Sequence, residues 1–399
     1  MKWEINLDED AVEEEKEAAK ETTPDMEAER RLREAAEFEN QQPNVALPPP
    51  VNPEDPYSHF STEETFLEFC PVSSLVESHP IRTVSWSPEG TGFCVGTNSK
   101  ALRICRLEEE DGVESIRVLH ERSNHHAGSV YCSSWNCEGR LIATGSNDKC
   151  VKVVRTYMDS DDPNLDVVGS SLESDDVLLK GHGGTVRDVQ FHLEDCGRLL
   201  SVGAHDNLCN VWDIVGTSGA DYQPVRSFMG HEATVYCGRF SSFDSNLLAT
   251  GSADNTVKLW DLRSVESDRA SISVDVGSPI LSLLWSGKFN VVSSHADGSV
   301  RELDVRTGKE VSVIQAHQDE CRSLDATPCG RFICTGGFDG LASIFKIGEG
   351  TAPDFVASLR MRSGGRILSA KWRPRGGQGV LLAGADCTVT YWGKKENLN

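Results

Sequence analysis

The sequence predicts an all-β protein made of about seven repeated units, each of four short strands, that stack side by side. The phrase Leu247–Arg263 (LLATGSADNTVKLWDLR) recurs in weaker forms about seven times along the chain. Apolar and polar residues alternate after most of the acidic turn residues, as in Val257–Trp260, and this alternation is typical of a strand. A unit of this length cannot bury its apolar face alone, so neighbouring units must stack.

Each repeat has two anchors, an opening residue and a turn residue. The openings are His79, His126, His182, His231, Gly277–Ser278, His317 and Gly364–Gly365. The turn residues are Asn98–Ser99, Asp148, Asp206, Asp254, Asp297, Asp339 and Asp386. Successive turn anchors lie 42 to 58 residues apart, close to the roughly 40–45 residues of a four-stranded unit plus loops. The spacing therefore predicts seven units.

This pattern resembles the WD-repeat family, whose repeats form the blades of a β-propeller. In that family the opening His bonds the turn Asp, which braces a Ser or Thr and a Trp, so the resemblance implies a structural network here. Only the fourth repeat carries the full set, which is His231, Thr250, Asp254 and Trp260. The third has His182, Asp206 and Trp212, with Val202 at the Thr position. The second has His126, Thr144 and Asp148, with Val154 at the Trp position.

Two regions are expected, an extension at residues 1–60 and one closed seven-bladed propeller at residues 61–399. Too few residues follow Trp392 for another strand, so we expect the apolar run at residues 65–70 to pair into the last blade and close the ring. Residues 1–60 are Glu-rich and then Pro-rich, which predicts a largely disordered acidic tail. A partner-docking helix at Asp25–Phe38 is the alternative.

Composition narrows the setting and excludes several functions. Thirteen Cys without a CxxC pair or a secretory segment predict reduced thiols in the cytosol or nucleus. No apolar run reaches 18 residues, so no membrane span is expected. A net charge of −23 argues against nucleic acid or an anionic membrane as the ligand. No phosphate loop, zinc spacing or catalytic motif is present, which predicts no enzyme activity, no cofactor and no metal site.

The function is therefore expected to lie in surfaces that bind other proteins, with the chain as a subunit of a larger complex. The residues that flank the anchors on one face are the predicted contacts: Asn147, Arg187, His205, Tyr236, Arg322, Phe338 and Arg366. The acid-free stretch Arg360–Arg375 is a second candidate, with Arg362, Arg366 and Arg373 as its docking residues. It would receive an acidic partner or the acidic tail, unless it is an ordinary solvated strand pair. Acidic insertions at residues 107–113 and 158–176 are expected at the rim.

Several phrases indicate a narrower group. The stretches Ile81–Cys105, His125–Val153 and Gly184–Phe191 resemble the propeller of nemitin-like microtubule-associated proteins. The resemblance implies a cytoplasmic scaffold at microtubules or in the axoneme of cilia or flagella, although an acidic tail stands where that family has a helical dimerisation region. The ending Trp260–Arg263 instead resembles substrate receptors of cullin-4 ubiquitin ligases, in which Arg263 would contact the adaptor. A subunit of an RNA-processing or chromatin complex fits any propeller.

Overall fold

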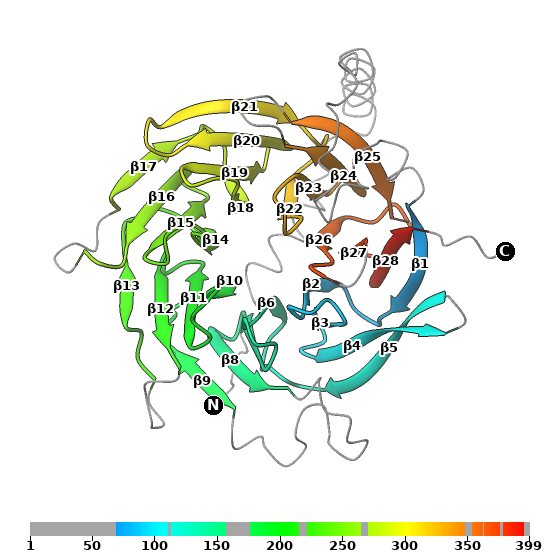
Figure 1. Ribbon diagram of the computed structural model, residues 1–399. Coiled ribbons are helices and arrows are strands. Elements are labelled where there is room, and N and C mark those ends of the chain that lie inside the picture. Colours follow the sequence, from blue (N-terminus) through cyan, green and yellow to red (C-terminus); the bar gives the residue numbers. More distant parts are fainter. Residues whose placement is uncertain are drawn as a thin grey trace, which may run out of the picture. The chain divides into compact units, whose positions relative to one another are not determined.

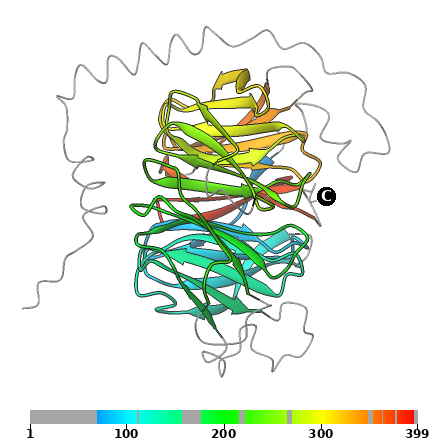
Figure 2. The ribbon, with the colours of Figure 1, turned by 90° about the vertical axis from the view of Figure 1, so that its left-hand side faces the viewer.

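Seven four-stranded antiparallel sheets surround a central channel, and the expected seven-bladed propeller is confirmed (Figure 1). The computed structural model describes residues 69–110, 113–156, 176–214, 222–264, 270–347, 353–361, 363–375 and 378–394. These residues form strands and turns, and no helix that could cross a membrane is found among them. Residues 1–60 and most of the insertion at 158–176 lie outside the described residues. Figure 2 shows the blades edge-on.

The strands of each blade follow one another outward from the channel. Blade one contains β2 (Ile81–Trp86), β3 (Gly92–Thr97), β4 (Leu102–Glu110) and β5 (Val113–Arg122). Blade two contains β6 (Val130–Trp135), β7 (Leu141–Ser146), β8 (Cys150–Arg155) and β9 (Val177–Lys180). Blade three contains β10 (Val186–Phe191), β11 (Arg198–Gly203), β12 (Cys209–Asp213) and β13 (Arg226–Phe228). Blade four contains β14 (Val235–Phe240), β15 (Leu247–Ser252), β16 (Thr256–Asp261) and β17 (Ile272–Asp275). Blade five contains β18 (Ile280–Trp285), β19 (Asn290–His295), β20 (Ser299–Asp304) and β21 (Lys309–Gln315). Blade six contains β22 (Cys321–Ala326), β23 (Phe332–Gly337), β24 (Leu341–Lys346) and β25 (Asp354–Arg360). Blade seven contains β26 (Ile367–Trp372), β27 (Gly379–Gly384), β28 (Thr388–Lys394) and, outermost, β1 (Phe69–Val76).

The ring is closed by β1, which pairs antiparallel with β28 from Phe69 opposite Lys394 to Val76 opposite Thr388. The sequence placed this strand at residues 65–70, and that range is wrong at its end; residues 65–68 lie outside the described residues. The strand Phe69–Val76 continues through Pro71, although proline is disfavoured within most strands. Here the pairing shifts register between Pro71 and Ser73 on an outermost strand, where the missing N–H of proline is tolerated.

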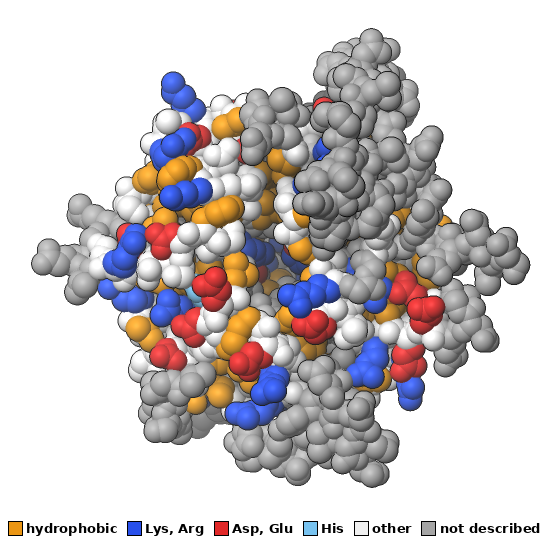
Figure 3. Space-filling view, viewed as in Figure 1, with side chains coloured by type: hydrophobic (Ala, Val, Ile, Leu, Met, Phe, Trp, Pro, Cys, Tyr) orange, Lys and Arg blue, Asp and Glu red, His pale blue; other side chains and the backbone are white. Residues whose placement is uncertain are grey.

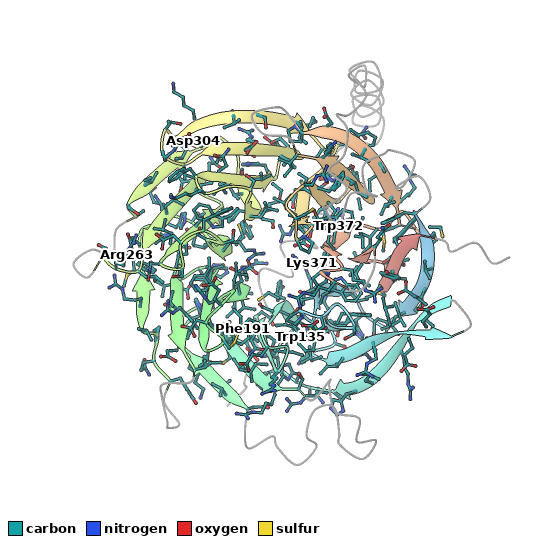
Figure 4. All side chains as sticks on the ribbon, viewed as in Figure 1. Trp135, Phe191, Arg263, Asp304, Lys371 and Trp372 are labelled. Carbon is teal, nitrogen blue, oxygen red and sulfur yellow. A yellow bond between two sulfur atoms is a disulfide. The ribbon has the colours of Figure 1, made fainter. Side chains whose placement is uncertain are left out.

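Apolar faces of neighbouring blades pack together, and tryptophans at the ends of inner strands join the blades. The indole Nε1 of Trp86 donates to the carbonyl of Lys371 (3.2 Å), and that of Trp135 donates to the carbonyl of Ser85 (3.0 Å). Trp285 makes the same bond to Arg239 (3.2 Å). Trp135 and Lys371 lie close to the channel in Figure 4. The first, second and fifth blades are thereby each fixed to the preceding blade of the ring at the end where the inner strands finish.

Thirteen reduced thiols were expected, and this expectation is wrong for two of them, because Cys137 and Cys196 form a disulfide. Cys137 lies between β6 and β7, and Cys196 lies between β10 and β11, so the bridge joins the second and third blades. Their Cα atoms are 5.6 Å apart, a normal separation for a disulfide. The sequence could not show this proximity, since the two cysteines are separated by 59 residues and meet only when the blades stack.

Histidine–aspartate networks brace four blades. In the fourth, His231 bonds Asp254 and Thr250 (both 2.7 Å), and the indole of Trp260 donates to Thr250 (2.9 Å). The His126–Asp148 and His182–Asp206 pairs (both 2.8 Å) and the His317–Asp339 pair (3.0 Å) hold the matching positions of the second, third and sixth blades. His79 differs from them, because it is exposed and bonds its neighbour Ser78.

The third blade corrects a sequence assignment. Its hydroxyl residue is Ser201, because Ser201 Oγ bonds His182 (2.7 Å) and accepts the indole N–H of Trp212 (2.8 Å). Val202 was expected at this position. Leu199 pairs with Trp212 just as Leu248 pairs with Trp260, so Ser201 corresponds to Thr250. One extra residue before Asp206 displaced the alignment, and the third blade also carries a full network.

Candidate protein-docking surface

The side chains around one channel mouth come from a β-bulge that recurs in every blade. Each inner strand shifts register at its second residue, which re-aims that side chain. The seven residues in this position are Arg82, Tyr131, Arg187, Tyr236, Leu281, Arg322 and Leu368. All seven line the central hollow, which has a volume of about 430 Å³. Lys and Arg side chains are visible in and around this hollow in the view along the channel (Figure 3).

This mouth lies on the face that holds the histidine–aspartate pairs. The start of each inner strand pairs with the end of the second strand, as Val235 does with Ser252. The bulge residues are therefore next to the turns between second and third strands, where Asp148, Asp206, Asp254 and Asp339 lie. We call this end of the propeller the His–Asp face.

Arginines and aromatic rings alternate along the mouth. The seven members are, in order, Arg82, Tyr131, Arg187, Tyr236, Arg322, Phe338 and Arg366. Six contacts join them, with each guanidinium carbon 4.9 to 5.8 Å from the centre of the neighbouring ring. These distances are within the range of attractive cation–π contacts. We call this set the arginine–aromatic chain.

The polar contacts of the arginine–aromatic chain are unevenly distributed. Arg82 donates to the amide oxygen of Asn98 (2.8 Å), and Arg322 lies 3.4 Å from a carboxylate oxygen of Glu320. The Nε of Arg187 is buried and has no hydrogen-bond acceptor among the described residues. Arg366 is exposed and stacks on Phe338.

Five of the predicted contact residues, namely Arg187, Tyr236, Arg322, Phe338 and Arg366, meet in the arginine–aromatic chain. Phe338 is half-buried between Arg322 and Arg366. Asn147 and His205 lie in the turns next to Asp148 and Asp206 on the same face.

Sequence reasoning missed Arg82 and Tyr131. They hold the same strand position as Arg187 and Tyr236, second in the inner strand, and that register was the available signal. Alignment on the inner strands instead of the turn acids brings all four into one column.

The stretch Arg360–Arg375 does not form one basic surface. Arg366 lies on the His–Asp face, whereas Arg373 follows β26 at the opposite end. The Arg373 side chain is 8% exposed and bonds Glu114 (2.6 Å) and the carbonyl of Gly90 (2.8 Å), so it is removed from the docking candidates. Lys371 pairs with Asp325 in the channel (3.3 Å). Arg362 lies outside the described residues.

Arg263 closes a local turn. Its guanidinium donates to both carboxylate oxygens of Asp261 (2.9 and 2.8 Å), and it also lies 3.3 Å from Asp244. Arg306 makes the same two-residue loop with Asp304 in the next blade (3.2 and 2.8 Å). Arg263 and Asp304 lie on the outer side of the ring in Figure 4. Recurrence in two blades favours a structural role for this ending, although the side chain of Arg263 is still 57% exposed.

The His, Cys, Asp and Glu side chains of the described residues do not gather into a metal site. No group of three or more His, Cys, Asp or Glu side chains that could hold a metal ion is found among them. The buried side chains of four histidines, His126, His182, His231 and His317, are engaged in the blade networks. For example, burial lowers the pKa of His231, although Asp254 opposes this shift.

Comparison with known proteins identifies the repeats. The WD40 family model (WD domain, G-beta repeat) matches residues 115–154, 175–213, 222–261 and 308–346. Protein tipD of Dictyostelium discoideum is 28% identical over 275 residues, which are 68% of this chain and 41% of tipD. Anaphase-promoting complex subunit cdc20 of the same organism is 31% identical over 219 residues, 54% of this chain and 38% of that protein.

Two further comparisons agree with the fold. The U3 small nucleolar RNA-associated protein 15 homolog of Xenopus laevis is 26% identical over 218 residues, 54% of this chain and 38% of that protein. The matches span about two-fifths of the length of these three relatives. The crystal structure of the WD40 β-propeller domain of Doa1 aligns with a TM-score of 0.64 at 18% identity, covering 82% of this chain and 98% of that one.

Proposed function

We propose that this WD40-repeat protein is a non-enzymatic scaffold that docks partner proteins on its His–Asp face as a subunit of a larger complex. One observation carries the proposal: the arginine–aromatic chain gathers four arginines and three aromatic rings around one channel mouth. Arg and aromatic side chains are the residues that contribute most often to binding energy at protein interfaces. The blade networks hold the surrounding turns in place, so this surface is largely formed before a partner arrives.

We further propose that the partners are cytoskeletal, at microtubules or in the axoneme, and that the protein acts in the cytoplasm. Support comes from the resemblance of Ile81–Cys105, His125–Val153 and Gly184–Phe191 to nemitin-like microtubule-associated proteins. The surface of tubulin is acidic, so attachment requires a local basic site on a chain whose net charge is −23. With Arg373 withdrawn, Arg187, Arg322 and Arg366 on the His–Asp face supply that site.

The relatives favour a second setting. One is named as a subunit of the anaphase-promoting complex and another as a U3 small nucleolar RNA-associated protein. A scaffold in a cell-division or RNA-processing complex would use the same face. A cullin-4 receptor would instead need Arg263 for its adaptor. In that case Arg263→Glu removes the adaptor from the partners, and an unchanged partner set rejects the receptor hypothesis.

Affinity purification of the tagged full-length protein from its native cells, followed by mass spectrometry, tests the proposal. The informative variant is Phe338→Asp, which puts a charge between Arg322 and Arg366. The matched control is Phe289→Asp. Phe289 also contacts an arginine, since the guanidinium carbon of Arg306 lies 4.3 Å from the centre of its ring. It lies, however, in the turn between β18 and β19, at the opposite end of the propeller. We expect partners to be lost from Phe338→Asp and kept by Phe289→Asp.

The identity of the lost proteins separates the settings. Tubulin or axonemal proteins support the cytoskeletal proposal, whereas subunits of the anaphase-promoting complex or of RNA-processing particles support the second setting. Equal partner sets for wild type and Phe338→Asp contradict docking on the His–Asp face.

A further inference from the structure

We propose that the arginine–aromatic chain binds an acidic segment of a partner protein, with Asp or Glu carboxylates paired to Arg187 and Arg366. The inference rests on the proposed docking function and adds the chemical class of the segment that docks. It follows from three features of the mouth: the stacking of the guanidinium groups, the shortage of local carboxylates, and the prior pairing of the acids in the channel.

Stacking prepares the guanidinium groups for a carboxylate. The guanidinium carbon of Arg187 lies 5.1 Å from the ring centre of Tyr131 and 5.6 Å from that of Tyr236. Rings that cover the flat side of a guanidinium leave its edge N–H groups available as donors. A carboxylate accepts two such bonds side by side, the strong bidentate arrangement. Because the rings already restrict the side chain, less conformational freedom is lost on binding.

Local carboxylates are too few to neutralise these arginines. Within the described part of the chain, Arg187, Arg322 and Arg366 have a single ion-pair contact between them, from Arg322 to Glu320 at 3.4 Å. That pair is partly exposed, since the Glu320 side chain is 36% accessible, and it is correspondingly weak. An incoming carboxylate therefore meets uncompensated positive charge and reduces the repulsion between neighbouring guanidinium groups.

The acids deeper in the channel are already used. Asp188 follows Arg187 in β10, but its carboxylate pairs with Arg239 and also accepts the N–H of Gly238 (3.2 Å). Asp325 pairs with Lys371 (3.3 Å) and accepts the N–H of Trp372 (2.9 Å). Neither carboxylate is available to the arginine–aromatic chain. The positive charge at the mouth therefore faces outward, toward a ligand.

The surrounding composition favours a short protein segment over a nucleic acid. The chain has 62 acidic and 39 basic residues, so it lacks the broad basic footprint that a phosphate backbone requires. Twenty of those acids but only six of the bases lie in residues 1–68. A segment with a few carboxylates matches a compact set of four arginines, and its aliphatic stems can contact Tyr131, Tyr236 and Phe338.

Fluorescence anisotropy with the full-length protein tests this inference. The probe is a fluorescein-labelled Glu-Gly repeat peptide, compared with Gln-Gly and Lys-Gly repeats of the same length. We expect the Glu-Gly peptide alone to bind, and its affinity to fall as NaCl is added, because exposed ion pairs are screened. The double substitution Arg187→Gln with Arg366→Gln should weaken binding at least about tenfold, as expected for lost charged hydrogen bonds.

Arg306→Gln is the matched control. Arg306 also stacks on an aromatic ring, but it is already paired with Asp304 and lies away from the His–Asp face. This variant should bind like wild type. The inference is overturned if the Glu-Gly peptide does not bind, if the Gln-Gly peptide binds equally well, or if Arg306→Gln weakens binding as much as the double variant does.

A second variant guards against misfolding of the double variant. Arg187→Lys keeps the charge but loses the planar fork, so it should melt like wild type and bind the Glu-Gly peptide several-fold more weakly. Unchanged affinity in Arg187→Lys argues against bidentate pairing at Arg187. If the peptide fails to bind while Phe338→Asp still loses partners in the purification, this inference fails and the docking function stands. If the double arginine variant binds the peptide like wild type and Phe338→Asp keeps all its partners, both this inference and the proposed docking function fail.

Discussion

The imidazole Nε2 of His125 lies 2.8 Å from the hydroxyl oxygen of Thr144. His125 thereby makes the hydrogen bond that a tryptophan makes at the matching position of the fourth blade. In the fourth blade the indole of Trp260 donates to Thr250, but the second blade has Val154 at that place. The neighbouring His126 bonds Asp148 through Nδ1, so its Nε2 accepts from Thr144 (2.9 Å). The remaining donor to that hydroxyl is His125, whose pKa burial lowers well below 6.5.

His125→Ala should therefore destabilise the protein by about 1–3 kcal/mol, since it removes a buried hydrogen bond and leaves a cavity. Chemical denaturation at neutral pH measures the change. His79→Ala is the control, because His79 is exposed and should alter stability by less than about 0.5 kcal/mol. Equal stabilities of the two variants would show that His125 does not replace the indole.

The hydroxyl of Ser201 is expected to matter as much as that of Thr250. Ser201→Ala leaves the buried indole N–H of Trp212 and the Nε2 of His182 without their shared partner, which should cost about 1–3 kcal/mol. Ser201→Thr should be close to neutral, because the fourth blade already holds Thr at this place. If adding Val202→Thr to Ser201→Ala restores stability, the structural register is wrong and the sequence alignment was right.

The outcome at these two blades shows how far sequence reasoning reaches. Repeat spacing predicted seven blades, because stacking requires each repeat to present the same faces to its neighbours. It put Val202 in the position that Ser201 holds, since one extra turn residue is invisible when repeats are aligned on their acids. It grouped Arg366 with Arg373, although the six-residue strand between them spans about 20 Å from one face to the other. Arg82 and Tyr131 were missed because alignment on the turn acids does not show that they share the strand position of Arg187 and Tyr236.

The Cys137–Cys196 bridge predicts a defined thiol count. Maleimide labelling of unfolded protein under non-reducing conditions should modify 11 cysteines, those that are free, and reduction should expose the remaining two. Because the bridge closes a loop across two blades, it should stabilise the oxidised protein by about 2–4 kcal/mol.

Cysteine variants check the assignment. Cys137→Ser and Cys196→Ser should lower the melting temperature of the oxidised protein equally, and the double variant should lower it no further. Cys329→Ser, which removes a free thiol, is the control. Thirteen reactive thiols without reductant would contradict the bridge.

His295 should make the fifth blade sensitive to mild acid. Its side chain is fully buried and bonds the hydroxyl of Ser293 (2.9 Å). Burial lowers its pKa from 6.5 to about 4, and nearby Arg301 acts in the same direction. Between these two pH values the unfolded chain binds more protons at residue 295 than the folded protein does. The stability that depends on a neutral His295 is therefore fully present above about pH 6.5 and is lost as pH falls toward 4.

At about pH 5 the loss from this one group should be about 1–2 kcal/mol. Melting curves of wild type and His295→Gln at pH 7 and pH 5 measure it. The variant is expected to be less stable at pH 7 and to lose less stability on acidification, because glutamine does not titrate. Parallel pH profiles for wild type and His295→Gln would mean that His295 is protonated as easily in the folded protein as in the unfolded chain.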